Sequence, residues 1–249
     1  MDCYDIIMKS EKKFFSNIKS VILAIFIAIL IRSFLFEPFN IPSGSMKPNL
    51  LVGDFIFVSK WSYGYSKHSL PFSIPVIPKK IFNKSPERGD VVVFKTPENN
   101  RTDYIKRVIG IPGDIVQVYQ GKIFINNEEI LRMKTKNFID TDIGVSFKEV
   151  RKYKEFFFDK EIEVLDLIDN GIVDNTQKFK VPKDHFFVLG DNRDNSQDSR
   201  FINTVGFIPF ENLVGKAEFI FFSLENSRFL QIWKWPNSIR YNRIFKKIK

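Results

Sequence analysis

Residues 18–36 read IKSVILAIFIAILIRSFLF, and residues 21–31 within them form an unbroken run of eleven apolar side chains. As a helix, the nineteen residues from Ile18 to Phe36 would be about 28 Å long, close to the ~30 Å hydrocarbon thickness of a bilayer. Arg32 would be costly at the bilayer centre, but near the end of the span its side chain can reach the headgroups. The stretch therefore predicts a transmembrane anchor at residues 18–36.

A cleavable secretory signal also has an apolar core that follows basic residues. No small-x-small cleavage pattern follows this core, and large residues, Phe34, Phe36 and Phe39, occupy that region instead. The sequence therefore favours an uncleaved anchor. Four lysines come before the apolar run, namely Lys9, Lys12, Lys13 and Lys19. By the positive-inside rule, residues 1–17 form a short cytoplasmic tail and the chain after the anchor lies on the far side of the membrane.

Beyond the anchor, apolar residues recur with period two and β-branched residues are frequent, which predicts strands. The expected strands are Asp54–Ser59, Asp90–Phe94, Tyr104–Ile109, Ile115–Tyr119, Lys122–Asn126, His185–Leu189 and Ala217–Phe222. Gln120-Gly121 predicts a hairpin turn, and four prolines make Ser62–Pro86 an extended surface loop. We expect a mostly β, antiparallel β-sheet domain at residues 37–225, with a smaller β-rich excursion at about 127–183 where the pattern is weaker.

The net charge of +9 invites a nucleic-acid interpretation, but its distribution argues against one. Residues 226–249 contain seven lysines and arginines and no acidic residue, so the rest of the chain is nearly balanced. Aromatic residues are interleaved with these charges, which suits an anionic membrane surface at least as well as phosphates. A solvated surface element remains the alternative for this basic aromatic C-terminal tail.

Cysteine and histidine are too scarce to support a metal site. Cys3 is the only cysteine, so a disulfide within the chain is excluded and a cysteine-based metal site is disfavoured. His68 and His185 lie far apart in the sequence and have no neighbouring carboxylates. We interpret both histidines as structural, and we expect neither a metal nor another cofactor.

Residues 42–48, PSGSMKP, directly follow the anchor. Proline and glycine favour a sharp, exposed turn, in which a serine hydroxyl can project while backbone N–H groups face the same point. Ser45 is therefore a candidate nucleophile. A turn of this composition is also typical of a plain linker, and the segment alone does not distinguish the two.

Residues 104–114, YIKRVIGIPGD, place a lysine on an apolar strand face. Because side chains alternate along a strand, Lys106 lies on the same side as Tyr104 and Val108, and Arg107 points the other way. Burial removes water from the amine and lowers its pKa, which would give a neutral amine able to accept a serine proton. The alternative is a lysine at a strand edge whose amine stays in water.

Residues 190–200, GDNRDNSQDSR, are eleven consecutive small, polar or charged residues after the strand at 185–189. They predict a loop dense in hydrogen-bonding groups. A calcium loop is the obvious alternative, but the alternating Asp/Asn ligands, the turn glycine and the closing glutamate of such loops are missing.

In this order, the anchor and the three segments resemble the bacterial type I signal peptidases, the serine/lysine enzymes that remove signal sequences from exported proteins. The matching stretches are the anchor and residues 43–50, 88–94, 104–114 and 190–200. The resemblance implies a signal-peptidase-like catalytic domain at residues 37–225. It implies that Ser45 is the acyl-forming nucleophile, that Lys106 is the general base, and that the Ser43 hydroxyl and the Ser45 backbone N–H form the oxyanion hole.

The resemblance also implies supporting and substrate-binding residues. Ser196 would orient the lysine amine, and Asp198 and Arg200 would form a supporting ion pair. Candidates for the shallow apolar substrate pockets are Phe39, Ile41, Pro42, Met46, Leu50, Tyr104 and Ile105. Pockets walled by large side chains accept only small substrate residues, as in an Ala-x-Ala cleavage site.

The expected protein is thus a monomeric serine endopeptidase of the bacterial plasma membrane that cleaves signal-peptide-bearing preproteins and contacts the lipid bilayer. Two alternatives remain. One is a serine/lysine autoprotease of the repressor type, although such proteins are soluble and carry a DNA-binding domain in front. The other is a catalytically silent, membrane-tethered binding protein. The chain departs from familiar family members in having one predicted span, and residues 128–180 contain no motif that indicates a role.

Overall fold

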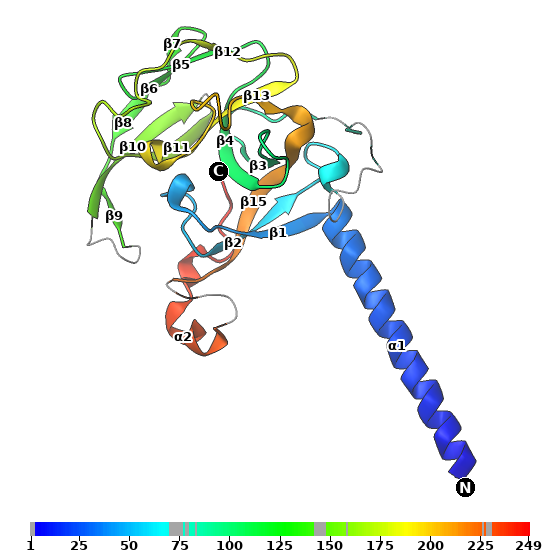
Figure 1. Cartoon of the computed structure of the whole chain (residues 1–249). Coiled ribbons are helices and arrows are strands. Elements are labelled where there is room, and N and C mark those ends of the chain that lie inside the picture. Colours follow the sequence, from blue (N-terminus) through cyan, green and yellow to red (C-terminus); the bar gives the residue numbers. More distant parts are fainter. Residues whose placement is uncertain are drawn as a thin grey trace.

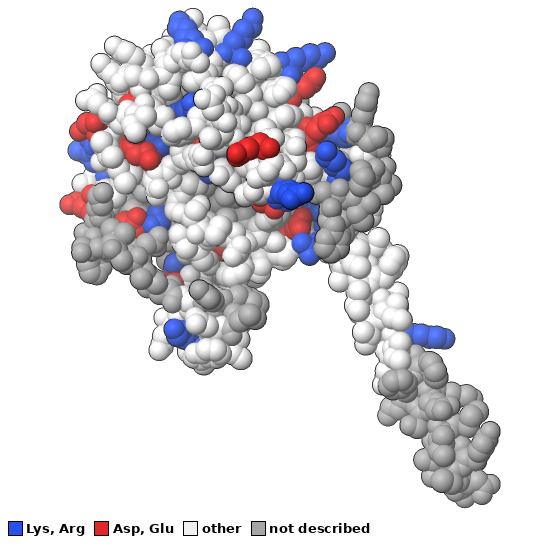
Figure 2. All heavy atoms as spheres, viewed as in Figure 1, with Lys and Arg blue, Asp and Glu red and all other residues white. Residues whose placement is uncertain are grey.

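The protein is described here from a computed structural model, which covers residues 3–69, 77, 80–82, 84–141, 148–157, 159–225, 227 and 231–249. For residues 3–16 and 148 only the backbone is described. A long helix, α1 (Cys3–Phe34), projects from a β-rich body (Figure 1). Its stretch Asn17–Phe34 has a mean hydropathy of 1.9 and is long and apolar enough to cross a membrane. Figure 2 shows charges scattered over the body and a long uncharged section of this helix next to it.

The long helix ends two residues before the last residue of the expected anchor. The helix stops at Phe34, and Phe36 already begins strand β1 (Phe36–Asn40), which pairs antiparallel with β2 (Asp54–Ser59). The physical reason is Pro38, because a proline disfavours helical geometry at the preceding residue and has no N–H for a helical hydrogen bond. The helix therefore ends two residues before Phe36, and the extent of the membrane span, expected at residues 18–36, stays a prediction.

Antiparallel pairs build the main sheet, which has seven strands in the order β1-β2-β15-β3-β4-β13-β14. Its other strands are β3 (Val91–Lys95), β4 (Asp103–Gly110), β13 (His185–Leu189), β14 (Ile208–Pro209) and β15 (Leu213–Ser223). The predicted strands in this part of the chain all occur. The main error is that β15 begins at Leu213 and not at Ala217, because its first residues pair with β3 before the rest pair with β2.

Two four-stranded sheets form the other end of the body (Figure 1). One has the order β12-β5-β6-β7, with β5 (Ile115–Tyr119), β6 (Lys122–Ile125), β7 (Glu128–Glu129) and β12 (Phe179–Lys180). The other has the order β11-β10-β8, with β8 (Arg132–Lys134), β10 (Lys148–Phe157) and β11 (Lys160–Asp166), and β9 (Phe138–Asp140) pairs with β10. The expected excursion at about 127–183 is β-rich, and its strands β7 and β12 share a sheet with β5 and β6, which precede it; its bounds as a separate unit stay a prediction.

Local sequence explains the hairpin between β5 and β6. Gln120 and Gly121 both have positive φ, 50° and 72°, as the predicted turn requires. The predicted loop at Ser62–Pro86 contains the short helix η2 (Lys67–Ser69) and a bridge between Tyr65 and Ile81, and no strand among its described residues. Residues 70–76, 78–79 and 83 of that loop lie outside the described residues.

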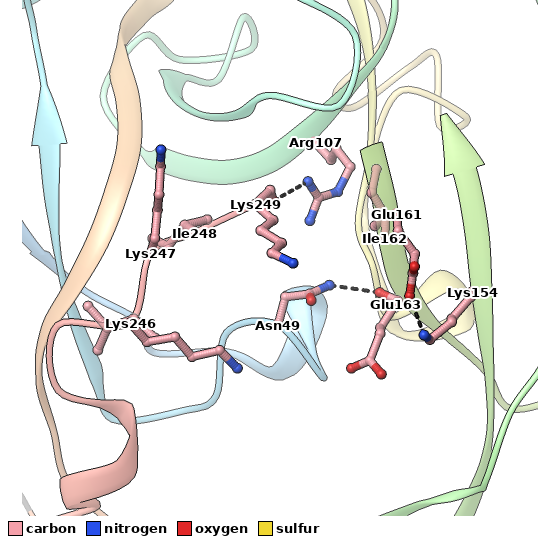
Figure 3. A pocket seen from close by; sticks show the side chains of 11 residues that line it. Asn49, Arg107, Lys154, Glu161, Ile162, Glu163, Lys246, Lys247, Ile248 and Lys249 are labelled. Atoms are coloured by element: carbon pink, nitrogen blue, oxygen red, sulfur yellow. Dashed lines mark hydrogen bonds and ion pairs between the residues drawn. The ribbon is translucent and has the colours of Figure 1, made fainter. Parts of the chain in front are cut away.

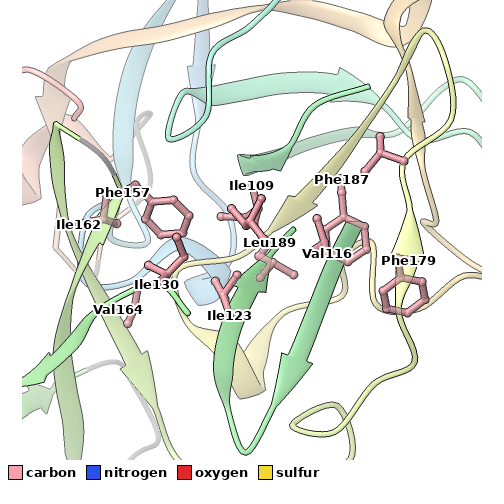
Figure 4. Close-up of a cluster of buried hydrophobic side chains, with 12 residues drawn as sticks. Ile109, Val116, Ile123, Ile130, Phe157, Ile162, Val164, Phe179, Phe187 and Leu189 are labelled. Atoms are coloured by element: carbon pink, nitrogen blue, oxygen red, sulfur yellow. The ribbon is translucent and has the colours of Figure 1, made fainter. Parts of the chain in front are cut away.

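Apolar side chains from all three sheets meet in one of the buried clusters. It combines residues of β4 and β13 with residues of the two smaller sheets, among them Ile109, Phe187, Ile123 and Phe157 (Figure 4). A second cluster lies under the turn after β1 and includes Ile41, Met46 and Leu50. The two smaller sheets are therefore packed onto the main sheet by a shared core, which fixes their position relative to residues on β4.

The described part of the basic aromatic C-terminal tail at 226–249 packs in part against the body. Bridges pair Leu224 with Ile239 and Phe219 with Lys247, so the last residues run beside β15. The Arg243 guanidinium is buried against the Asp54 carboxylate, which partly neutralises it. The short helix α2 (Trp235–Ser238) lies outside the sheet, with the exposed Trp233 before it. Residues at the end of this segment therefore pack beside β15, whereas the part around α2 is exposed.

Candidate active site

The turn after β1 holds Ser45 in a fixed backbone. The Ile41 N–H donates to the Asp54 carbonyl at 2.8 Å, and Ser45 lies in the short helix η1 (Gly44–Met46). Met46 and Leu50 have no exposed surface, so the turn is pinned to the core on its inner side. Ser45 itself is 8% exposed. The sequence correctly indicates a turn here, and the buried side chains that follow it exclude a plain linker.

Lys106 reaches Ser45 from the middle of β4. Its amine lies 2.8 Å from the Ser45 hydroxyl oxygen and also donates to the Ile105 carbonyl at 3.0 Å. The side chain is 4% exposed. Burial lowers the pKa of Lys106 to about 8, and the carboxylates of Asp198 and Asp191 oppose part of that effect. An amine with this pKa is partly neutral near neutral pH and can accept the serine proton.

Ser43 lies on the exposed side of the same turn. Its hydroxyl oxygen is 3.5 Å from that of Ser45. The neighbouring backbone is extended at Ser43, with φ −130° and ψ 157°, and enters the helix η1 at Gly44. The Ser43 hydroxyl thus lies next to the candidate nucleophile, where a side-chain donor to an oxyanion is needed.

The polar loop 190–200 fastens this turn from the other side. Asn192 binds it twice, because its backbone N–H donates to the Ser45 carbonyl and its side-chain amide donates to the Gly44 carbonyl, both at 3.0 Å. Position 190 has to be glycine because the backbone of Ser45 and the side chain of Ser196 lie too close for any side chain there. A Cβ at this position would lie 2.6 Å from the Ser45 carbonyl oxygen and 2.2 Å from the Ser196 hydroxyl oxygen. These contacts were not predicted from the sequence.

Ser196 is buried, and its hydroxyl has no hydrogen-bond partner among the described residues. No hydrogen bond joins it to Lys106 among the described contacts, so its base-orienting role stays a prediction. Asp198 and Arg200 do form the expected buried ion pair at 2.8 Å. Asp198 also accepts the Gly190 N–H at 3.1 Å, and Arg200 donates to the Arg193 carbonyl, so the pair holds the loop together.

Two ion pairs attach the excursion to these loops, and sequence reasoning missed both. Lys47, two residues after Ser45, contacts both carboxylate oxygens of Asp140 on β9 at 2.6 and 2.7 Å. Glu155 on β10 pairs with Arg193 of the polar loop, with 1% and 5% of the two side chains exposed. The two partners of each pair lie so far apart in the sequence that no motif indicates their contact.

A third missed pair joins Arg107 to Asp191 at 2.6 Å, with both side chains 1% exposed. Arg107 points away from Lys106, as strand alternation predicts, but into the core. Figure 3 shows this arginine lining a cavity of about 230 Å³ between the C-terminal residues and β11. Ser45 and Lys106 do not line this cavity, which is bounded instead by residues such as Asn49, Glu163 and Lys249.

The expected substrate-pocket residues fall into two groups. Ile41, Met46 and Leu50 are at most 3% exposed and belong to the core, so they support the site from below and present almost no surface. Phe39, Tyr104 and Ile105 are partly buried and Pro42 is exposed. Only the second group has surface that a substrate can contact in this structure.

The histidines lie where structural residues are expected. His68 is 5% exposed, and burial lowers its pKa to about 4. His185 contacts the Lys183 carbonyl at 2.8 Å. Among the residues that the structure describes, His, Cys, Asp and Glu form no group of three with the geometry to hold a metal ion.

Comparison with known proteins finds relatives of this chain. Residues 14–222 match the family described as signal peptidase, peptidase S26. Signal peptidase I of Rickettsia typhi is 39% identical over 256 aligned positions, which cover 96% of this chain and 96% of that protein. Signal peptidase I of Rickettsia bellii is 42% identical, covering 92% of this chain and 84% of that protein. A solved signal peptidase I from Enterococcus faecalis V583 aligns at 25% identity with a TM-score of 0.32, covering 53% of this chain and 97% of that one.

Proposed function

This chain belongs to the signal peptidase family, peptidase S26, and on that premise we propose how its residues perform the reaction. The protein is a serine endopeptidase that removes signal peptides, and its substrates are signal-peptide-bearing preproteins. The family match favours this activity over a repressor-type autoprotease. We propose that Ser45 is the nucleophile and Lys106 the general base.

One observation carries the assignment: the Lys106 amine lies 2.8 Å from the Ser45 hydroxyl in a buried setting. This is the distance over which a base accepts a proton from a nucleophile. The lowered pKa of Lys106, about 8, makes the neutral amine accessible near neutral pH. A catalytically silent binding protein would have no need of a desolvated lysine against a serine.

The reaction is an acyl transfer. Neutral Lys106 takes the Ser45 proton while the serine oxygen attacks the scissile carbonyl, which forms a tetrahedral oxyanion. The Ser43 hydroxyl and the Ser45 backbone N–H donate to that oxyanion. The lysine ammonium then protonates the leaving amine as the C–N bond breaks. Finally the neutral amine activates a water, which hydrolyses the ester and restores the serine.

Ser196, Asp198 and Arg200 have supporting roles in this proposal. The buried pair of Asp198 and Arg200 keeps the loop in place, and Asp198 limits how far the pKa of Lys106 falls. The buried Ser196 hydroxyl, which has no hydrogen-bond partner among the described residues, would orient the lysine amine. Phe39, Tyr104 and Ile105 would wall the substrate pocket, and large walls admit small substrate side chains.

Cleavage of a preprotein that carries an Ala-x-Ala site tests the assignment. Wild type, Ser45→Ala and Lys106→Ala are compared in detergent, with the surface substitution Lys122→Ala as the control. Both site variants should retain the fold and lose turnover, and the control should match wild type. Full activity in Lys106→Ala would exclude this lysine as the base.

The family and the apolar helix indicate a membrane-anchored protein. We further propose that the N-terminus is cytoplasmic, that the body lies on the extracytoplasmic side of a bacterial plasma membrane, and that the enzyme acts as a monomer. The four lysines at and before the start of the apolar run support this orientation. Protease added outside sealed spheroplasts should digest the body and spare the N-terminus. Protection of the body would reverse the topology.

An aromatic surface supports contact between the body and the bilayer. Phe36, Trp61, Phe57 and Phe219 form a chain of ring contacts with centroid distances of 4.5 to 6.4 Å. The segment that carries α2 leaves the body on the same side as α1 (Figure 1). Trp233 within it is 72% exposed. Tryptophan and phenylalanine on such a surface suit the membrane interface.

A further inference from the structure

The junction between α1 and the body contains a three-residue ion network that neither the chemistry nor membrane insertion requires. Glu37 on β1 receives Arg32 of the last helical turn, through both its Nε at 3.1 Å and its terminal nitrogen at 2.8 Å. The other carboxylate oxygen of Glu37 pairs with Lys60 at 2.8 Å. Glu37 therefore connects the helix to a lysine at the end of β2.

Lys60 is a rigid support for this network. Its side chain is 2% exposed, and its amine also donates to the Ser69 carbonyl at 2.6 Å. Its backbone N–H donates to the Leu35 carbonyl at 3.0 Å, directly after the helix. Because a buried amine is held in place by these partners, Glu37 is held too, and the Arg32 guanidinium meets a fixed carboxylate.

A second contact acts beside the ion network. The Tyr65 hydroxyl donates to the Phe34 carbonyl at 2.8 Å, and the two rings pack edge to face at 5.7 Å. Between residues 17 and 34, Ser33 has the only buried side chain among those described. Within residues 17–34 the helix thus contacts the body at its last turn, and its direction depends on the contacts made there.

We propose that Arg32, Glu37 and Lys60 form a latch that fixes the orientation of the transmembrane helix, so that Ser45 is held at a set height above the bilayer. This inference rests on the proposed function. Without the latch, a 10° change in tilt would move the far end of a ~28 Å span by about 5 Å, and equivalently tip the body over the surface. A membrane-spanning substrate has its cleavage site at a fixed height, so its cleavage should slow when the position of Ser45 varies. A short soluble peptide can follow the active site, so its cleavage should not change.

Arg32→Gln is the test variant, because the arginine side chain is 62% exposed and its loss leaves the buried Lys60–Glu37 pair intact. Arg101→Gln, an exposed arginine on the β3–β4 loop, is the charge-matched control. Each full-length variant is reconstituted into vesicles of phosphatidylethanolamine and phosphatidylglycerol. Two substrates are compared, a membrane-inserted preprotein in the vesicles and a soluble Ala-x-Ala peptide in detergent.

Arg32→Gln should lower kcat/KM for the inserted preprotein by about three- to tenfold and leave peptide hydrolysis within about twofold of wild type. Arg101→Gln should change neither. A preprotein with two successive Ala-x-Ala sites adds a second measurement, the fraction of cleavage at each site. Loss of stability would not change this fraction, whereas Arg32→Gln should make cleavage at the two sites more nearly equal. Equal losses on both substrates, or no loss and an unchanged site choice, would overturn the latch. If wild type cleaves neither substrate, the proposed function itself fails.

Discussion

Replacing Lys106 with methionine should abolish peptidase activity and at the same time stabilise the protein at neutral pH. The pKa of Lys106 falls from an ordinary 10.5 to about 8 in the folded protein, because burial disfavours the ammonium. The unfolded chain therefore binds this proton more tightly, and protonation favours unfolding. The gap between 10.5 and about 8 corresponds to about 3 kcal/mol, which is the full cost below pH 8.

The cost depends on pH in a defined direction. Below pH 8 the buried ammonium lowers the free energy of unfolding of wild type by the full amount of about 3 kcal/mol. This loss becomes smaller as the pH rises from 8 to 10.5, and it is nearly absent at pH 10.5. Methionine fills a similar volume and does not titrate. It gives up the hydrogen bonds to Ser45 and to the Ile105 carbonyl, worth about 1 kcal/mol each, and this loss does not vary with pH. The net gain at pH 7 should be about 1–2 kcal/mol.

Urea unfolding in detergent, followed by tryptophan fluorescence at pH 7 and pH 10.5, measures the effect. The stability of Lys106→Met relative to wild type should fall by roughly 3 kcal/mol between the two pH values, from a gain of about 1–2 kcal/mol at pH 7 to a loss of about 1–2 kcal/mol at pH 10.5. Lys122→Met, at a lysine 46% exposed, should change stability by less than about 0.5 kcal/mol at both. A pH-independent difference for Lys106→Met would refute the desolvation of this lysine.

Three further outcomes are expected. In wild type, kcat/KM for a soluble peptide should rise about tenfold from pH 6 to pH 7 and level off above pH 9. The reason is that the neutral fraction of Lys106 increases until the pH exceeds its pKa of about 8. A rise in kcat/KM centred near pH 10 would contradict this. Ser43→Ala should lower kcat by about 10²–10³ while Ser45 remains titratable by an acylating inhibitor, since one oxyanion donor is lost. Asp140→Asn should remove the carboxylate that contacts the buried Lys47 amine and reduce cleavage and stability together, and the double variant Lys47→Met/Asp140→Asn should recover stability; unchanged unfolding in the single variant would show that the pair is not structural.

Strands with strong local patterning were predictable. Asp54–Ser59, Ile115–Tyr119 and His185–Leu189 occur with the expected bounds, because alternating or continuous apolar residues end at turn residues on both sides. Strand β1 was not predicted, since Pro38 argues against a strand and the pairing with β2 that stabilises it is a tertiary effect. The sequence pattern therefore places Phe36, the first residue of β1, in the anchor.

The site was predictable where its residues fall in recognisable segments, and not where it depends on distant charges. Ser45 and Lys106 were named from two segments, and the structure brings them together. Asp140 carries no local signal, because a carboxylate on a short strand is ordinarily a surface residue. Glu155 is misleading for the same reason, since it occurs in a strongly charged strand and yet is 1% exposed. Arg243 lies in a basic stretch that suggested a solvated or membrane-bound tail.

Because β1 is paired with β2 along its whole length, the number of residues between α1 and Ser45 is fixed. The strand runs directly from the end of α1 to the turn that holds Ser45, and each of its five residues has a defined partner on β2. Inserting or deleting one residue there would turn Glu37 and Phe39 to the opposite face, and would displace either the helix or the serine by about 3.3 Å. Length variation among related chains should therefore fall before Arg32 or after Leu50, and the stretch between them should be constant in length even where its residues differ.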